Sequence, residues 1–340
     1  KSEKTDSKND QGNLFIGWAS EDITPDKPVL LHGQFPARIS EGVRDPVTVT
    51  ALAIESVSGS SPEKVIMISC DLVVISDGTR SGSSDNLGVK ARDSIKKSIP
   101  EISAEQIIIN ATHTHTAPYC SSEDTKDLYG IELDVMSPAE CQEYVAELIS
   151  KAAERAWKVR KPGGISFGLS HAVASHNRLW SHFSGETTKR GNTNAEDFSH
   201  IEGYEDHSVN LLYTWDANRD LTGVVINLAS PSQALGGGHL ISADYWHEAR
   251  GELRNRLKKD IFILPQCSPA GDQAPHILVG LKAEERMQKL MFPGIEGTGN
   301  DCMGRRKQVA LRVVDAVTTI LPYMKENIEW EYNEDNGGDD

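Results

Sequence analysis

The chain has 340 residues, a hydrophobic content of 38% and a formal net charge of −15 at pH 7. This length is enough for one large domain or two small ones. The acidic balance excludes non-specific nucleic-acid binding, because phosphate contacts need clustered Lys and Arg. No apolar run approaches the length of about 20 residues that a membrane span needs. Five cysteines without a Cys-x-x-Cys pair disfavour a zinc ribbon or a redox pair.

Both ends of the chain are polar. Residues 1–13 contain no apolar side chain, so they cannot offset the entropy lost on ordering, and we expect a flexible tether. The segment resembles the stretch after the lipidated cysteine of a bacterial lipoprotein whose signal peptide has been removed. That resemblance implies an extracytoplasmic protein, periplasmic or at the cell surface, with membrane attachment through an N-terminal lipid; a trimmed chain end is the alternative. Residues 326–340 are expected to be a frayed tail.

Apolar runs and turn residues predict interleaved strands and helices. Strands are expected at 14–19, 47–55, 64–69, 107–109, 165–175, 209–215, 221–229 and 261–264. Helices are expected at 85–98, from the capping box at 137–140 to a point before Pro162, at 245–257 and at 305–321. Residues 181–205 are polar and predict a long loop of functional type. The pattern predicts an α/β fold over 14–325, with a mixed β-sheet core and flanking helices.

Polar residues follow several of the predicted strands. They are Asp71, His113, His115, His176, Arg178 and Asp272. Sites in open α/β sheets form in the crevice outside the carboxyl ends of strands. We therefore expect these side chains to converge on one cavity, which is the main argument from the residues for an enzyme.

The stretch from Ile107 to Tyr119 holds the most specific pattern, in which a buried strand runs into Thr-His-Thr-His. Side chains alternate along a strand, so His113 and His115 are expected on the same side. Two such imidazoles can hold a metal, or one can bind metal while the other handles a proton. The alternative is a pair of solvated histidines at a strand tip.

Several segments occur in the order seen in one enzyme family. They are Ile16-Gly17, Asp22-Ile23-Thr24-Pro25, Leu30-Leu31-His32-Gly33, Ile68-Ser69-Cys70-Asp71, Ala111-Thr112-His113-Thr114-His115-Thr116-Ala117-Pro118, His176-Asn177-Arg178, Ile241-Ser242-Ala243-Asp244 and Gly271-Asp272-Gln273-Ala274-Pro275-His276. With these segments the sequence resembles the neutral/alkaline, non-lysosomal ceramidase family over most of residues 14–325.

The resemblance implies the ceramidase-like α/β catalytic domain and zinc-dependent hydrolysis of an amide (N-acyl) bond in a lipid-like substrate. By it, His113 would be a zinc ligand, His115 and Arg178 would contact the substrate or its oxyanion, and Gly33 would line the site. Zinc would acidify a water and polarise the carbonyl, while Arg and His would stabilise the developing negative charge.

The chain departs from the family pattern at two places. The family serine, a nucleophile or substrate contact, falls on Ala274, which has no hydroxyl; Ser268 is a partial substitute. The strand Ile226–Pro231 lacks the family's second histidine ligand. Replacement ligands are sought among His239, Asp244, His247 and His276. Asp244 and His247 are preferred, because residues three apart at a helix start share a face.

Other candidates have roles and alternatives of their own. Asp71 is expected either to orient a histidine or to cap a turn. Asp272 is expected to be a ligand, to orient its loop or to form an Asx-turn. His176 and Trp180 are expected to bind substrate, Trp180 by stacking on a lipid chain or a sugar ring.

Three functions remain open at the level of sequence. The first is a zinc-dependent ceramidase-type hydrolase acting on a small lipid-like substrate. The second is a hydrolase of the same scaffold acting on a glycan-like substrate. The third is a binding protein whose site is inactivated by Ala274. The sequence leaves the oligomeric state open.

Overall fold

The computed structural model describes residues 13–57, 62–76 and 85–330. The tether expected at 1–13 lies outside the described residues except for Asn13. The frayed tail expected at 326–340 is wrong over its first residues, because Glu329 pairs with Ile165 and the side chains of Ile328 and Trp330 pack on the core; residues 331–340 lie outside the description. Among the residues that are described, no helix combines the length and the apolar character needed to cross a bilayer. The extracytoplasmic location and the lipid anchor stay predictions.

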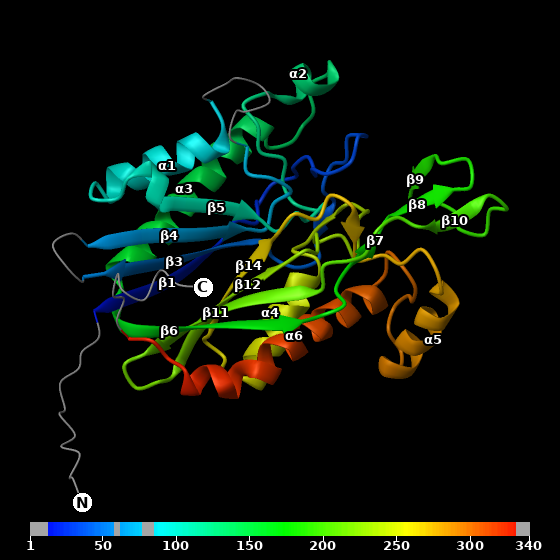
Figure 1. The fold of residues 1–340 in the computed structure, drawn as a ribbon. Helices are drawn as coiled ribbons and strands as arrows, with labels where there is room; N and C mark the ends of the chain where they lie inside the picture. The colour runs from blue at the N-terminus through cyan, green and yellow to red at the C-terminus, as the bar shows by residue number, and fades with distance from the viewer. Residues whose placement is uncertain (1–12, 58–61, 77–84, 331–340) are drawn as a thin grey trace, which may run out of the picture.

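One large mixed sheet organises the chain (Figure 1). Its strands are β1 (Leu14–Asp22), β3 (Thr48–Ser56), β4 (Glu63–Cys70), β5 (Ile107–Ala111), β6 (Lys161–His171), β11 (Ser208–Asp216), β12 (Leu221–Leu228) and β14 (Phe262–Cys267). Their order is β14-β12-β11-β6-β1-β3-β4-β5. The pairs β4–β5 and β12–β14 are parallel. The other neighbours are antiparallel. The prediction of a mixed sheet is confirmed.

Short strands and helices complete the fold. The short strands are β2 (Gly42–Val43), β7 (His176–Asn177), β8 (Leu179–His182), β9 (Thr187–Lys189), β10 (Phe198–Ile201), β13 (Leu240–Ile241) and β15 (Gln273–Ala274). The helices are α1 (Leu87–Ser98), the 3-10 turn η1 (Ala104–Gln106), α2 (Thr125–Tyr129), α3 (Pro138–Lys158), α4 (Tyr245–Arg256), α5 (Leu281–Met291) and α6 (Met303–Glu326).

The sheet folds back on itself, so that its two halves face each other. Trp18 and Leu52 from one half share a buried apolar cluster with Val225 and Leu264 from the other. The side chain of Asn110 on β5 donates a hydrogen bond of 3.1 Å to the carbonyl of Pro265 on β14. The opposite ends of the strand order are therefore in contact, and the parallel pairs end near each other.

Helices cover the outer faces of the two halves. The apolar faces of α1 and α3 pack on β1, β3 and β4, and those of α4 and α6 pack on β11 and β12 (Figure 1). Ser137 caps α3 as its spacing predicted, with Glu140 completing the capping box. The chain thus has four layers, with helices outside and two sheet faces inside.

The structure corrects the prediction of a loop at 181–205. This stretch contributes to a separate sheet with the order β10-β8-β9, whose centre is Trp180 packed on His182 and Phe198. Exposed polar residues and the turn at Gly185, where φ is +87°, conceal the strand alternation in the sequence. The helix α5 was also not predicted.

One buried carboxylate connects the layers near the ends of β4 and β5. Asp71, which is 0% exposed, accepts hydrogen bonds from the backbone N–H and the hydroxyl of Thr48 at 2.9 and 3.0 Å. It also accepts one from the Thr112 hydroxyl at 3.3 Å. Arg250 of α4 donates to both carboxylate oxygens, at 2.7 and 3.0 Å. Asp71 is therefore neither a histidine partner nor a turn cap; it fixes the segment that leads into His113.

Replacing Asp71 with Asn should destabilise the protein strongly. The amide leaves the buried charge of Arg250 without its partner, and breaking one side of a buried ion pair costs about 3–5 kcal/mol. Urea unfolding of Asp71→Asn should show this loss. The exposed Asp93→Asn on α1 is the control and should change the free energy of unfolding by less than about 0.5 kcal/mol. Equal stabilities of the two variants would contradict the assignment.

Candidate active site

The Thr-His-Thr-His segment leaves β5 in a fixed conformation. The backbone N–H groups of Thr112 and Thr114 donate to the carbonyls of Cys70 and Leu72 at 3.0 and 3.2 Å. Both threonine side chains are buried, whereas His113, with φ of 64°, is turned out of the strand path. The strand ends at Ala111, four residues before His115, so strand alternation does not place the two histidines. The threonines anchor the segment, and the histidines are left to face the site.

His113 and His115 approach each other at their Nε2 atoms, which lie 3.4 Å apart. The Nδ1 atom of His113 is 2.7 Å from the carbonyl oxygen of Val73. A carbonyl only accepts, so Nδ1 donates the proton and Nε2 of a neutral His113 carries a lone pair. A neutral His113 therefore has a basic nitrogen directed at His115.

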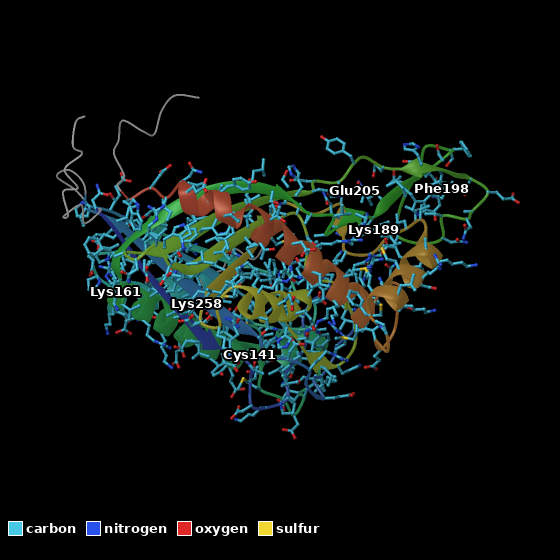
Figure 2. The ribbon with its side chains drawn as sticks, turned by 90° about the horizontal axis from the view of Figure 1, so that it is seen from below. Cys141, Lys161, Lys189, Phe198, Glu205 and Lys258 are labelled. Atoms are coloured by element: carbon cyan, nitrogen blue, oxygen red, sulfur yellow. The ribbon has the colours of Figure 1, made fainter. Side chains whose placement is uncertain are left out.

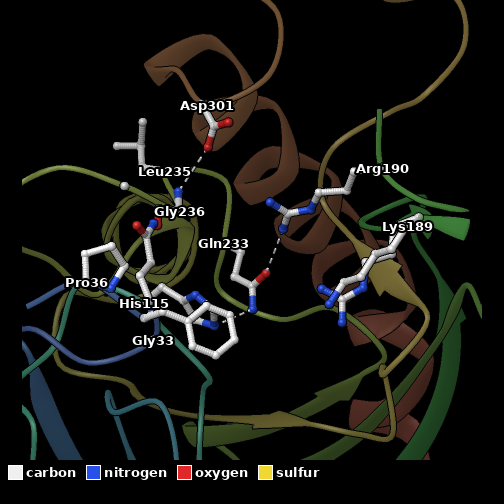
Figure 3. Close-up of a pocket in the computed structure, with 13 residues that line it drawn as sticks. Gly33, Pro36, His115, Lys189, Arg190, Gln233, Leu235, Gly236 and Asp301 are labelled. Atoms are coloured by element: carbon white, nitrogen blue, oxygen red, sulfur yellow. Dashed lines mark hydrogen bonds between the residues drawn. The ribbon is translucent and has the colours of Figure 1, made fainter. Parts of the chain in front are cut away.

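Gln233 completes this pair and was not found from the sequence. Its Nε2 lies 2.8 Å from Nε2 of His115, and its Oε1 accepts from Arg190 at 3.4 Å (Figure 3). The side chain is 1% exposed. The hydroxyl of Ser232 beside it donates to the carbonyl of Thr112 at 2.8 Å. Gln233 lies just beyond Ile226–Pro231, the strand that lacks the expected histidine, but no local sequence pattern marks it.

Gly33 lies against the ring of His115. Its φ is +106°, and a Cβ built there would come within 2.5 Å of Cγ of His115. A side chain at 33 would therefore strain the backbone and displace the imidazole. His32 next to it is a further missed histidine, packed on Tyr119 with ring centroids 4.1 Å apart.

Two of the histidines at the site, His115 and His32, are held neutral by their surroundings. Burial, then the neighbouring His113, lowers the pKa of His115 to about 3. Burial, again followed by His113, lowers the pKa of His32 to about 4. Arg38, whose guanidinium donates to the carbonyl oxygens of His32 and His115 at 2.9 and 2.6 Å, adds its positive charge to both shifts. Above these values both rings lack the second proton, so they can accept hydrogen bonds at neutral pH.

Two cavities meet at the histidine pair. One, of about 590 Å³, is lined by His115 and Gly33. The other, of about 410 Å³, is lined by His113. Arg178 and Gln233 line both. The pair therefore lies where an extended ligand would pass from one cavity into the other.

Arg178 is held at this boundary by the Gly-Asp turn. Its Nε and Nη2 donate to the carbonyl of Gly271 at 3.1 and 2.6 Å, and its backbone N–H donates to the carbonyl of Asp272 at 2.8 Å. The carboxylate of Asp272 lies 3.4 Å from the side-chain amide of Asn177 and lines neither cavity. Asp272 thus positions Arg178 through the turn, which corresponds to its loop-orienting alternative.

Besides Asp272, three other expected site residues lie outside these cavities. Ala274 is 0% exposed and pairs with His176 between β15 and β7. His176 lies 3.8 Å from Glu205, and burial lowers its pKa to about 4. Trp180 is 3% exposed and donates to the carbonyl of Arg190 at 2.6 Å. Its ring is covered by its own small sheet, so the expected stacking on a substrate is corrected to a structural role.

The preferred metal ligands do not assemble. The buried carboxylate of Asp244 accepts hydrogen bonds from the backbone N–H groups of Ala234, Leu235 and Tyr245, at 3.0, 2.7 and 2.8 Å. It caps α4 and has no oxygen directed at His113. His247 lines a different cavity, of about 260 Å³, beside Glu248. Asp244 and His247 both lie at the start of α4, but that position does not bring them to the histidine pair.

The other two replacement ligands are also engaged elsewhere. Nδ1 of His239 is 3.0 Å from the carbonyl of Ile39, and Nε2 of His276 is 3.3 Å from Asp301. The spacing of the His113–His115 pair does match two corners of a tetrahedral zinc, which lie about 3.3 Å apart for bonds of about 2.05 Å. In the described part of the chain, however, no three His, Cys, Asp or Glu side chains converge on one point. The donors therefore do not fit a zinc site with three protein ligands.

The depressed pKa of His115 predicts a pH dependence of stability. Below about pH 6.5, the ordinary pKa of histidine, this ring is protonated in the unfolded chain but stays neutral in the folded protein. The contribution of His115 to the free energy of unfolding therefore has its full value at pH 7.5 and declines as the pH falls toward 4.5, by less than about 1.4 kcal/mol per pH unit. Urea unfolding at several pH values should show a shallower decline for His115→Gln than for the parent chain. Identical slopes would contradict the burial of a neutral ring.

A comparison with known proteins finds similarity at the level of the fold. No family model matches the sequence, and no curated protein matches it. The crystal structure of neutral ceramidase from Pseudomonas aeruginosa is similar, with a TM-score of 0.68 and 18% identity over 92% of this chain and 45% of that one. A ceramidase complexed with C2 gives 0.67 and 19%, over 92% of this chain and 44% of that one. The chain spans less than half the length of these proteins. Its fold is the ceramidase-like α/β fold that the sequence resemblance predicted.

Proposed function

We propose that this chain is a hydrolase that cleaves an amide (N-acyl) bond in a lipid-like substrate, with His113 and His115 at its catalytic centre. One observation carries the proposal: the facing Nε2 atoms lie 3.4 Å apart at the meeting point of two cavities. The ceramidase-like fold supports the reaction class, because both similar structures are named as ceramidases.

His113 is the general base of the proposed reaction. Its Nδ1 is committed to the Val73 carbonyl, so Nε2 takes the proton from a water as the water oxygen attacks the amide carbon. The C–N bond then breaks, and the leaving nitrogen receives that proton from Nε2. The products are a carboxylic acid and an amine, and His113 returns to its neutral form.

Arg178 and Gln233 supply the electrostatic part of the mechanism. Both line the two cavities at the point where the carbonyl would lie. The Gly271 carbonyl fixes the guanidinium, and Arg190 fixes the Gln233 amide. Donors that are held before the reaction stabilise the developing oxyanion without a cost of reorganisation. The neutral His115 beside them is the acceptor that keeps the Gln233 amide in place.

The cavity of about 410 Å³ supports an acyl chain as one half of the substrate. Its lining is mostly apolar, with Val73, Val74, Ile75, Ile109 and Ala111 from the β4 and β5 ends. Apolar walls with a few placed polar groups are typical of small-molecule sites. This composition favours the lipid-like substrate over the glycan-like one.

The role of His113 can be tested by turnover. We expect His113→Gln to lower kcat for release of laurate from N-lauroyl substrates by about 10²–10⁴-fold, the usual contribution of a general base. Stability should be nearly unchanged, because the side chain is only half-buried. The matched control is His200→Gln, an exposed histidine on β10, which should retain full activity.

Two results would contradict this assignment. Equal activity of His113→Gln and the parent chain would exclude His113 as the base. A parent chain that binds N-acyl compounds without turning any over would favour the binding-protein alternative attached to Ala274.

Zinc dependence is a separate question with its own measurement. Two imidazoles without a third ligand bind zinc weakly, so we expect elemental analysis of the dialysed protein to find well below one zinc per chain. We also expect laurate release to survive treatment with EDTA. The control is the same assay after zinc is added back. One zinc per chain that disappears in His113→Ala would instead support the ligand role implied by the family resemblance.

A further inference from the structure

The larger cavity carries a concentration of positive charge that the proposed hydrolysis does not use. Arg178, Lys189 and Arg190, here named the cationic wall, line it together. In Figure 3 Lys189 and Arg190 lie across the cavity from Gly33 and Pro36. The chain as a whole has a net charge of −15, so this clustering runs against the general charge of the protein.

The described structure gives the cationic wall no ion pair, although the charge of Asp272 acts to raise the pKa of Arg178 and the charge of Arg190 acts to lower the pKa of Asp301. Among the described residues, no carboxylate lies within ion-pair distance of any of the three side chains. Arg178 and Arg190 donate instead to neutral oxygens of Gly271 and Gln233. The carboxylate that does line the cavity is Asp301, which accepts from the Gly236 N–H at 3.2 Å and lies 3.3 Å from His276.

The three side chains of the cationic wall also repel one another, which again favours a bound anion. The charge of Arg178, then burial and the charge of Arg190, lowers the pKa of Lys189. Burial first, then Arg190, lowers the pKa of Arg178, although Asp272 opposes this shift. An anion placed among the three groups would remove this repulsion.

We propose that the part of the substrate that enters the larger cavity carries an anionic group, a carboxylate or a sulfonate. This inference rests on the proposed function and deepens it. The apolar cavity takes the acyl chain, the amide lies at His113 and His115, and the acid pairs with the cationic wall. The substrate class is thus an N-acyl amino acid or N-acyl aminosulfonate. An uncharged head group would remove water from the Arg178 guanidinium without supplying a negative charge to compensate.

Two substrates that differ in one group test the charge. N-lauroylglycine and N-lauroylethanolamine share the acyl chain and the amide, and differ in a carboxylate against a hydroxymethyl group. We expect kcat/KM to be about tenfold higher for the acid, which corresponds to about 1.4 kcal/mol. Most of the difference should lie in KM, and it should shrink as salt is raised.

Lys189 offers a clean variant, because the described structure gives its side chain no hydrogen bond or ion pair and the side chain is exposed. We expect Lys189→Glu to reduce the preference for the acid to less than about twofold. Lys258→Glu makes the same change of charge and is the control, since Figure 2 places Lys258 far from Lys189. It should keep the full preference.

The outcomes separate this inference from the proposed function. Equal turnover of the two substrates would overturn the inference and leave the hydrolase intact. If neither is turned over, calorimetry decides: binding of N-lauroylglycine alone, lost in Lys189→Glu, would support the anion site while the hydrolase proposal fails. A parent chain that neither hydrolyses nor binds the acid would overturn the inference.

Discussion

The buried pair of Asp71 and Arg250 is the interaction on which the site depends. It joins the end of β4, the start of β3 and the helix α4, and through Thr112 it reaches the segment that carries His113. A buried ion pair is a weak source of net stability, because desolvation offsets the attraction. Its value here is geometric: the pair specifies where two halves of a folded-back sheet meet, and the two cavities lie at that junction.

The pattern Thr-His-Thr-His follows from this junction. The alternate threonines are buried and hydrogen-bonded, as in the bond of Thr114 to the Ser242 carbonyl at 2.9 Å. The chain between them therefore turns its histidines toward the site. A positive φ at His113 is uncommon outside glycine, and such conformations persist where the surroundings determine them and cluster at functional sites. The same residues that fix the backbone thus set the 3.4 Å separation of the imidazole nitrogens.

Sequence reasoning recovered the parts of this structure that leave local signals. The capping box at Ser137, the mixed sheet, the histidine pair and Arg178 each depend on short spacings or strand ends. It failed where the determining contact is distant. Gln233 is 118 residues from His115, and nothing near it in the chain marks an amide that contacts an imidazole. Asp244 looked like a ligand beside His247, but three backbone N–H groups occupy its carboxylate, which only the folded loop reveals.

The segment that was expected to be a loop has the largest consequence for function. The small sheet of β8, β9 and β10 stands where a loop was expected, and it holds Lys189 and Arg190 at the cavity that His115 lines. The strand β9 ends at Lys189, and the Arg190 N–H donates to the Arg178 carbonyl at 2.7 Å. The side chains of Arg178, Lys189 and Arg190 therefore face one cavity. A flexible loop would let these groups separate and solvate. Because ordered strands keep them together, their repulsion is a fixed property of the cavity, and an acidic ligand is the partner that relieves it.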